Sequence, residues 1–120
     1  METPKIFESE YRFCTILWEN EPIKSSALVS LCGEKLGWKP TTAYTVMKRL
    51  AERGVIENRD TIVRSLVGRD EAERAEIDEL VEKKFGGSLP AFVAAFAKNR
   101  CLSDEEVAEL QKLIDGMRGR

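Results

Sequence analysis

Residues 37–56, GWKPTTAYTVMKRLAERGVI, predict an amphipathic helix that decides the fold class. Pro40 suits a first turn, where no backbone N–H is needed, and Arg53-Gly54 supplies a basic last turn followed by a helix-ending glycine. We therefore expect a helix over 41–53. Its inward residues recur at the i, i+3, i+4, i+7 spacing of a buried face. They are Ala43, Val46, Met47 and Leu50.

The opposite face of this helix combines hydroxyls, an aromatic ring and two cations. Hydroxyls can hydrogen-bond base edges or phosphates, and cations suit phosphates. Either of the first two threonines is also expected to cap the helix. Two simpler interpretations stay open here: a solvated polar face, and an ion pair of Arg49 with Glu52 or Glu57. The face consists of Thr41, Thr42, Tyr44, Thr45, Lys48 and Arg49.

Two helices are predicted before this one. Residues 8–19 have an apolar stripe at helical spacing and are followed by Asn20-Glu21-Pro22, which ends the helix. The next helix has a similar stripe, and Ser25 or Ser26 is expected to cap it. Gly37 suits the position just past its last turn. The 41–53 helix is therefore the third of three short helices.

A β-hairpin is predicted directly after the third helix. Val55-Ile56 and Ile62-Val63 flank a short polar tip. Because an isolated hairpin is marginally stable, it must pack against the helices. Three helices followed by a hairpin is the order of a winged helix-turn-helix, so we expect a mainly α fold with a small β-hairpin. Arg59 at the tip and Arg64 on the return strand are candidate DNA contacts, and the alternative is a pair of solvated charges.

The charge of the chain is divided unevenly. Residues 1–69 contain 11 Lys+Arg and 9 Asp+Glu, whereas residues 70–120 contain 8 and 12. Within residues 37–69 there are 7 basic and 3 acidic side chains. This distribution is expected when the first part of the chain binds a polyanion and the second part does not. We therefore predict a DNA-binding domain over 1–69 and a second domain over 70–120.

Several classes of protein are disfavoured. The chain has no histidine, which removes the commonest general base and the commonest zinc ligand. Cys14, Cys32 and Cys101 are isolated; the first two are expected to be buried. We expect no catalytic site, no metal and no cofactor. No apolar run is long enough to span a bilayer and no secretory signal is visible, so a cytoplasmic location without membrane attachment is expected.

The tail is predicted to be three helices with exposed apolar faces. Residues 70–85 and 89–99 are separated by Gly86-Gly87, with Ser88 as a cap, and Ser103 opens the last helix with a capping box. A helix that is apolar nearly all round needs more cover than its neighbours in one chain provide. We therefore expect a homodimer; the alternative is a ligand pocket. The expected interface residues are Leu80, Phe92, Val93, Phe96, Leu110, Leu113 and Ile114.

The ordered set of motifs resembles the penicillinase and methicillin-resistance repressor family, the BlaI/MecI/CopY group. The similarity runs from about Ile6 to Ile114 and is carried by a tryptophan closing the first helix, "GW", "TAYTVMKRLAERG" and "LSDEEVAELQKLI". It implies a homodimeric winged-helix repressor that binds an inverted-repeat operator on double-stranded DNA. Base and phosphate contacts would fall on the outer face of the 41–53 helix, and the wing's contacts on Arg59 and Arg64. A winged-helix module used only for protein contacts is the alternative.

Two departures from the family pattern bear on regulation. In the antibiotic-sensing branch, a protease triggered by a membrane-bound sensor cuts an Asn–Phe bond; the matching bond here is Ala95–Phe96, without the asparagine. In the copper-sensing branch, a CxC-type cluster ends the chain, and no such cluster is present. The resemblance thus implies a sensor protease as a candidate partner and gives no support to metal sensing.

Overall fold

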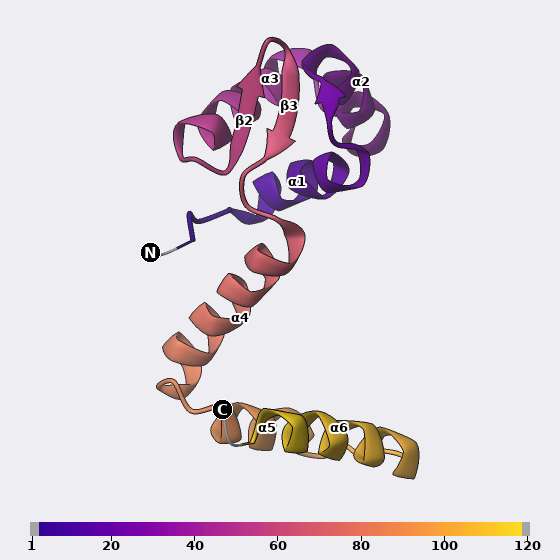
Figure 1. Ribbon diagram of the computed structural model, residues 1–120, viewed down its shortest axis with the longest axis vertical. Helices are drawn as coiled ribbons and strands as arrows, with labels where there is room; N and C mark the ends of the chain where they lie inside the picture. The colour runs from indigo at the N-terminus through magenta and orange to yellow at the C-terminus, as the bar shows by residue number, and fades with distance from the viewer. Residues whose placement is uncertain (1–2, 119–120) are drawn as a thin grey trace. The chain divides into compact units, whose positions relative to one another are not determined.

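The computed structural model describes residues 3–118 (Figure 1). The described residues form six helices and three short strands. In chain order these are α1 (Glu8–Asn20), β1 (Ile23–Lys24), α2 (Ser25–Leu36), α3 (Pro40–Glu52), β2 (Ile56–Arg59), β3 (Ile62–Ser65), α4 (Arg69–Phe85), α5 (Leu89–Ala97) and α6 (Asp104–Met117). The predicted fold class, mainly α with a small β component, is confirmed.

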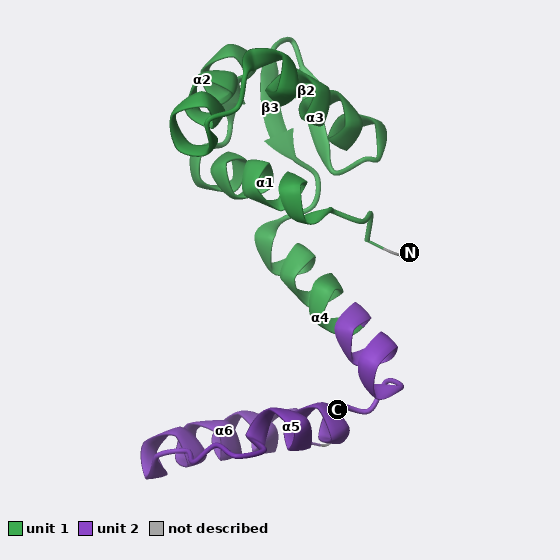
Figure 2. Ribbon diagram, turned by 180° about the vertical axis from the view of Figure 1, so that it is seen from behind, with its two compact units in different colours: residues 1–78 green, residues 79–120 purple. Residues whose placement is uncertain are grey.

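The chain forms two compact units that divide within α4, between Asp78 and Glu79 (Figure 2). We call them the head and the tail. The head contains α1–α3, the three strands and the first part of α4, and the tail contains the rest of α4 with α5 and α6. The functional boundary expected at residues 69 and 70 stays a prediction.

The head is a winged helix-turn-helix. α2 and α3 are joined by a short turn, and the β2–β3 hairpin follows α3 as the wing. The sheet is antiparallel with strand order β1-β3-β2. The two-residue strand β1 was not predicted; it pairs Ile23 with Val63 and Lys24 with Ile62. It joins the wing to the segment between α1 and α2, so the hairpin is not isolated.

The core of the head lies where the inner faces of α1, α2 and α3 meet the sheet. Phe13, Leu17, Leu28, Leu50 and Val63 are completely buried there. Burying each large apolar side chain stabilises the fold by about 1.5–3 kcal/mol. The predicted inward stripe of α3 is confirmed, because three of its members are buried and the fourth, Val46, packs partly buried against the core.

The side-chain caps predicted for α2 and α3 are wrong. α2 is capped by Lys24 and α3 by Lys39, and neither side chain hydrogen-bonds to its helix; Ser25, Ser26, Thr41 and Thr42 all lie inside the helices. The Ser25 N–H instead donates to Thr61 O at 2.8 Å. Pro40, the first residue of α3, has no N–H to satisfy. Tertiary contact and proline chemistry thus replace the expected caps.

Positive φ angles fix the direction of the chain on both sides of α3. Gly37 has φ +70° and Gly54 has φ +82°, a region that costs other residues energy because of their Cβ. The wing turns at Asp60 and Thr61, with φ +53° and +65°. Two residues with positive φ are typical of the tightest hairpin turns, whose twist matches that of the strands.

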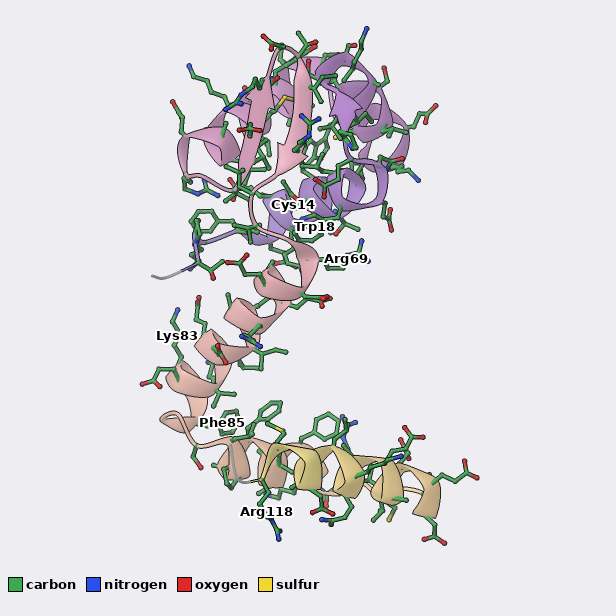
Figure 3. All side chains as sticks on the ribbon, in the orientation of Figure 1. Cys14, Trp18, Arg69, Lys83, Phe85 and Arg118 are labelled. Carbon is green, nitrogen blue, oxygen red and sulfur yellow. The ribbon has the colours of Figure 1, made fainter. Side chains whose placement is uncertain are left out.

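The beginning of α4 is held against α1. The Trp18 indole N–H donates to Val67 O at 3.0 Å, and the Arg69 guanidinium lies over the Trp18 ring, 5.7 Å from its centre (Figure 3). Arg69 also pairs with Glu19 at 3.7 Å, and Ala72 is buried in the core of the head. The first turns of α4 therefore belong to the head.

Two of the three cysteines are buried, as predicted. Cys14 and Cys32 lie in the core of the head, and Cys101 is exposed in the tail. Burial raises the pKa of the Cys14 thiol to about 12, with a further contribution from the nearby Glu10 carboxylate. Burial likewise raises the pKa of Cys32 to about 11. Both thiols are thus protonated and unreactive in the folded head.

The tail helices have the predicted caps and little cover. Ser88 Oγ accepts the Ala91 N–H at 3.1 Å, and Ser103 forms a capping box with Glu106. Within α5 and α6, no residue from Leu89 to Ala97 or from Asp104 to Met117 is buried. No helix within residues 3–118 is both long enough and apolar enough to cross a membrane.

Candidate nucleic-acid interface

The outer face of α3 is exposed along its length. Tyr44, near the N-terminal end, is 46% exposed, and Lys48 lies one turn further along. The core contacts of Met47 and Leu50 hold the opposite face, so these outer side chains project away from the head. The structure therefore places the six residues predicted on this face, from Thr41 to Arg49, at the surface of one helix.

The threonines of α3 form a shallow hollow. Thr45 Oγ1 donates to Thr41 O at 2.8 Å, so its hydroxyl hydrogen is used within the helix. Helical threonines commonly make this bond, and it turns Oγ1 back towards the preceding turn. The Thr45 methyl and the unused oxygen lone pairs are what this residue presents outward. The hollow is lined by Thr41, Thr42, Thr45, Val46 and Arg49.

The N-terminal end of α3 presents backbone donors together with a cation. The first helical hydrogen bond runs from Ala43 N–H to Lys39 O at 3.1 Å. The N–H groups of Thr41 and Thr42 precede that bond, and among residues 3–118 no side chain caps the helix. Lys39 is exposed at the cap position itself. N–H groups, helix dipole and ammonium thus all favour an anion such as a phosphate.

The wing presents charges of both signs. Arg59 pairs with Glu57 at 3.3 Å, and Glu57 also stands directly across the hairpin from Arg64. On the opposite side of β2, the Asn58 amide contacts the sulfur of Met47 in α3 at 3.7 Å. The wing is therefore packed against α3 through Asn58, while both predicted arginines lie on its outward side.

The basic side chains of residues 37–69 divide into two groups. Three arginines are paired within the head: Arg53 with Glu10, Arg59 with Glu57 and Arg69 with Glu19. The others have no ion pair with any residue of the described range 3–118, and Arg49 pairs with neither Glu52 nor Glu57. This second group consists of Lys39, Lys48, Arg49 and Arg64.

The tail presents the residues predicted for an interface. Phe92 is half-buried between Phe85 and Phe96, with ring centres 5.6 and 6.4 Å away. Phe96 itself is 54% exposed, and the Arg100 guanidinium lies 4.5 Å from its ring centre. The remaining predicted residues are all exposed. They are Leu80, Val93, Leu110, Leu113 and Ile114.

The family model described as "Penicillinase repressor" matches residues 6–116. The chain belongs to the penicillinase repressor family. Among its relatives are the penicillinase repressor of Bacillus licheniformis, 22% identical, and the methicillin resistance regulatory protein MecI of Staphylococcus aureus (strain Mu50 / ATCC 700699), 23% identical. The first alignment covers 98% of this chain and 94% of the relative, and the second 95% and 96%. A 16.5 kDa protein of Latilactobacillus sakei, described as uncharacterized, is 27% identical over 93% of this chain and 80% of its own length.

One residue beside the candidate interface, Lys39, was missed by sequence reasoning. Lys39 precedes the amphipathic pattern, yet it occupies the N-cap position of α3 beside the unpaired N–H groups, without a capping hydrogen bond from its side chain. The signal that was available is its place directly before Pro40. A proline at the first helical position identifies the preceding residue as the cap, and a lysine there cannot cap the helix but can bind an anion.

Proposed function

We propose that this member of the penicillinase repressor family is a homodimeric, sequence-specific DNA-binding repressor. The observation that carries the proposal is the outer face of α3, where threonines, Tyr44, Lys48 and Arg49 are exposed together on the second helix of a helix-turn-helix. A helix of this kind fits the major groove, and the residues near its N-terminus reach the base edges. Two similar proteins are named as repressors or resistance regulators.

Base reading is assigned to Thr41, Thr42, Tyr44 and Thr45. They occupy the first turns of α3, which is the part of a recognition helix that approaches the bases. The hydroxyls of Thr41, Thr42 and Tyr44 can donate to or accept from base edges. Thr45, whose hydroxyl hydrogen is used within the helix, can contact a thymine methyl through its own methyl group. This half of the outer face therefore supplies sequence preference.

Phosphate contacts are assigned to the four cations of residues 37–69 that have no ion pair with any residue of the described chain. Lys39 and the N-terminal N–H groups of α3 suit one phosphate, while Lys48 and Arg49 lie about two and a half turns further along the helix. Arg64 extends the contacts to the wing. Arg59 joins it when DNA phosphate replaces Glu57 as its partner. Phosphate binding of this kind dominates affinity and weakens as salt concentration rises.

Dimerisation is assigned to the apolar faces of the tail. Phe96, Leu113 and Ile114 are 54%, 66% and 57% exposed in the single chain. Large apolar residues exposed on two consecutive helices favour an interaction surface there. A second copy covers them with an identical face, which is the commonest form of symmetric association. Two heads then face an inverted repeat, and occupancy of that repeat blocks transcription.

Binding assays with selected DNA test the proposal. Wild-type protein is used to select a duplex from a random library, and its affinity for that duplex is compared with its affinity for a scrambled duplex. Fluorescence anisotropy is expected to show a ratio of about 1,000 or more, and the selected sequence is expected to be an inverted repeat. Equal affinity for both duplexes would favour a winged-helix module that binds protein instead.

Sedimentation equilibrium tests the interface. Phe96→Asp or Leu110→Asp places a charge on the proposed interface and is expected to leave a folded monomer at concentrations where wild type is a dimer. Lys98→Ala, an exposed change at the end of α5, is the control and should leave the dimer intact. A stable, tight dimer of both aspartate variants would overturn the interface assignment.

Proteolysis is the route of derepression that the family resemblance suggests. The matching Ala95–Phe96 bond lies in α5, where both residues are exposed. Because α5 is short and uncovered in the single chain, local opening is the physical route by which a protease reaches the bond. Co-expression with a membrane-bound sensor protease, followed by mass spectrometry, is expected to show cleavage there. Loss of repression while the chain stays uncleaved would point to another signal.

A further inference from the structure

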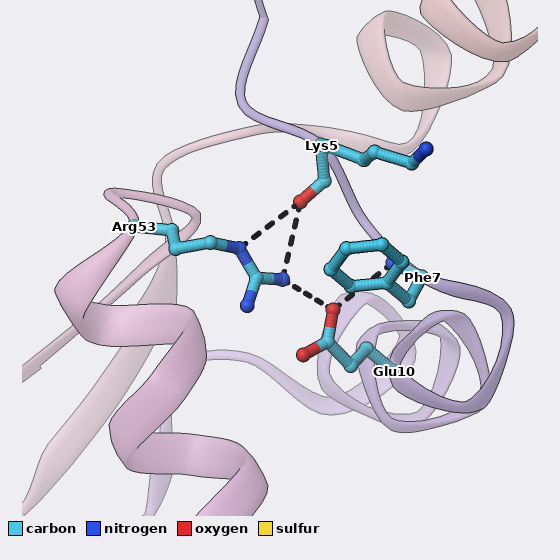
Figure 4. Close-up of polar contacts among 4 residues, drawn as sticks. All are labelled: Lys5, Phe7, Glu10 and Arg53. Atoms are coloured by element: carbon cyan, nitrogen blue, oxygen red, sulfur yellow. Dashed lines mark hydrogen bonds and ion pairs between the residues drawn. The ribbon is translucent and has the colours of Figure 1, made fainter.

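The C-terminal end of α3 is tied to α1 by an ion pair between a buried glutamate and a partly exposed arginine. Glu10, in the first turn of α1, is 5% exposed and is the one buried charged side chain within residues 3–118. Its carboxylate accepts a hydrogen bond from the Arg53 guanidinium and another from the Phe7 N–H, the latter at 3.0 Å (Figure 4). Arg53 is the C-cap residue of α3, directly after its last helical residue. The pair therefore joins the last turn of α3 to the first turn of α1.

The Arg53 guanidinium is held from more than one direction. Nε and Nη2 donate to the Lys5 carbonyl oxygen at 3.3 and 3.1 Å, on the side away from the helix of Glu10 (Figure 4). The Phe7 ring lies 5.2 Å from the guanidinium carbon. A planar guanidinium with several directional partners has one favourable orientation, unlike an apolar contact that tolerates sliding.

The apolar contacts of the inner face of α3 restrain the orientation of the helix less strictly than the hydrogen bonds of Arg53 do. Its contacts to the core run through Ala43, Met47 and Leu50, a small residue, a flexible one and a branched one. Apolar cores accept small shifts when volume is conserved, and methionine adapts readily to such shifts. Base reading is less tolerant, because hydrogen bonds weaken steeply with angle and distance. Something directional must therefore fix the tilt of α3.

We propose that Glu10 and Arg53 are a positioning pair that sets the orientation of the DNA-reading helix. The inference rests on the proposed function. Arg53 lies at the C-terminal end of α3, where an exposed arginine could bind a phosphate, but its guanidinium pairs with Glu10 instead. Buried ion pairs contribute little net stability compared with apolar packing, and their best-supported role is to select one arrangement of the chain.

The decisive variant is the double substitution Glu10→Leu/Arg53→Leu. Removing Arg53 alone leaves the buried Glu10 carboxylate without its charged partner, which is destabilising, whereas replacing both residues with apolar ones is often neutral or stabilising. The double variant also leaves net charge unchanged, so its general attraction to DNA is unaltered. Any loss of discrimination then reports geometry. Arg53→Lys keeps the charge but loses the planar fork, and Val63→Ala removes core volume without touching the pair.

The test measures discrimination, which is the affinity ratio between the wild-type-selected duplex and a scrambled duplex at one salt concentration. Circular dichroism melts first identify a temperature at which every variant is folded. The double variant is expected to lose about tenfold in this ratio, through weaker binding of the selected duplex alone. Arg53→Lys is expected to fall between the double variant and wild type, and Val63→Ala to keep the wild-type ratio.

Two kinds of result would overturn the inference. A folded double variant with the wild-type ratio shows that the pair does not position α3. If the double variant does not fold, Arg53→Lys decides instead, and a wild-type ratio in that variant shows that the guanidinium fork does not position α3. A wild-type protein without any discrimination refutes the proposed function itself, and the role of the pair with it.

Discussion

Replacing Lys48 with alanine is expected to flatten the salt dependence of DNA binding. Lys48 lies on the outer face of α3 and has no ion pair with any side chain of residues 3–118, so its ammonium is available to a phosphate. A protein that neutralises phosphates releases condensed counterions, and the logarithm of its affinity falls linearly with the logarithm of salt concentration. The slope of that line counts the phosphates that are neutralised.

The structure sets the size of the effect. Four cations in residues 37–69 have no ion pair within the described chain, namely Lys39, Lys48, Arg49 and Arg64. A dimer that uses all of them neutralises about eight phosphates, which gives a slope of about −7. Lys48→Ala removes two of the eight and changes the slope to about −5. Between 50 and 200 mM salt, the affinity should therefore fall about 10,000-fold for wild type and about 1,000-fold for the variant.

Fluorescence anisotropy at four or more salt concentrations measures the two slopes on the same selected duplex. Lys98→Ala removes one positive charge from the tail and serves as the matched control, which should keep the wild-type slope. A variant slope within half a unit of wild type would refute the reasoning, since Lys48 would then not contact phosphate. A reduced slope in the control would show that net charge alone produces the effect.

Three further predictions address single groups. Glu57→Gln frees Arg59 and removes a carboxylate from the wing, so DNA affinity should rise roughly two- to threefold; an unchanged affinity in the anisotropy assay would mean that the wing does not approach DNA. Because the Thr45 hydroxyl is used within α3, Thr45→Val should bind DNA like wild type. Thr45→Ser removes the methyl group that would contact a thymine methyl, so it should weaken binding by about 1 kcal/mol. On a duplex in which uracil replaces thymine, Thr45→Ser and wild type should bind equally. At pH 8, a thiol reagent should modify the exposed Cys101 quickly and the buried Cys14 only on unfolding. The free energy of unfolding should fall as pH rises from about 9 toward 12, because the Cys14 thiol ionises in that range in the unfolded chain but not in the folded one.

Local signals in the sequence were sufficient for α3 and the wing. The stripe of α3 follows from the helical period, and the core confirms it. Pro40 and Gly54 mark the beginning of the helix and the turn beyond it because their backbone requirements hold wherever they occur. In the tail, Ser88 and Ser103 were recognised as caps for a similar reason, since a cap bonds only to residues two or three positions away.

Contacts between distant residues could not be predicted in this way. β1 has two residues, and it exists because Ile23 pairs with Val63, far along the chain. The same pairing region places Thr61 O where it accepts the Ser25 N–H, so α2 needs no serine cap. A pattern read along the sequence contains no information about which segments will meet. The missed strand and the incorrect cap therefore have one physical cause.

Two of the arginine pairs, Arg53 with Glu10 and Arg69 with Glu19, also join distant residues, and together with the local pair of Arg59 they change how the charge of the head is interpreted. The excess of basic residues in 37–69 suggested a wide phosphate-binding surface, yet Arg53, Arg59 and Arg69 are each paired with a glutamate in the head. Arginine suits the pair with Glu10 because the planar fork of Arg53 binds a carboxylate and a carbonyl together. The cations that remain number four in that segment, which lowers the expected affinity of one head for DNA.

Because one head has only four such cations in residues 37–69, the affinity for DNA depends more strongly on dimerisation. Four phosphate contacts give one head a salt slope of about −4, so its affinity at physiological salt should be weak. Two heads joined by a shared tail bind the second half-site at a high effective concentration, and the combined affinity exceeds that of either head by about 100-fold or more. Separating the tails should then release DNA without any change in the heads. The Phe96→Asp monomer with an intact α3 should therefore bind a single half-site as wild type does, and bind the full inverted repeat no better than a half-site.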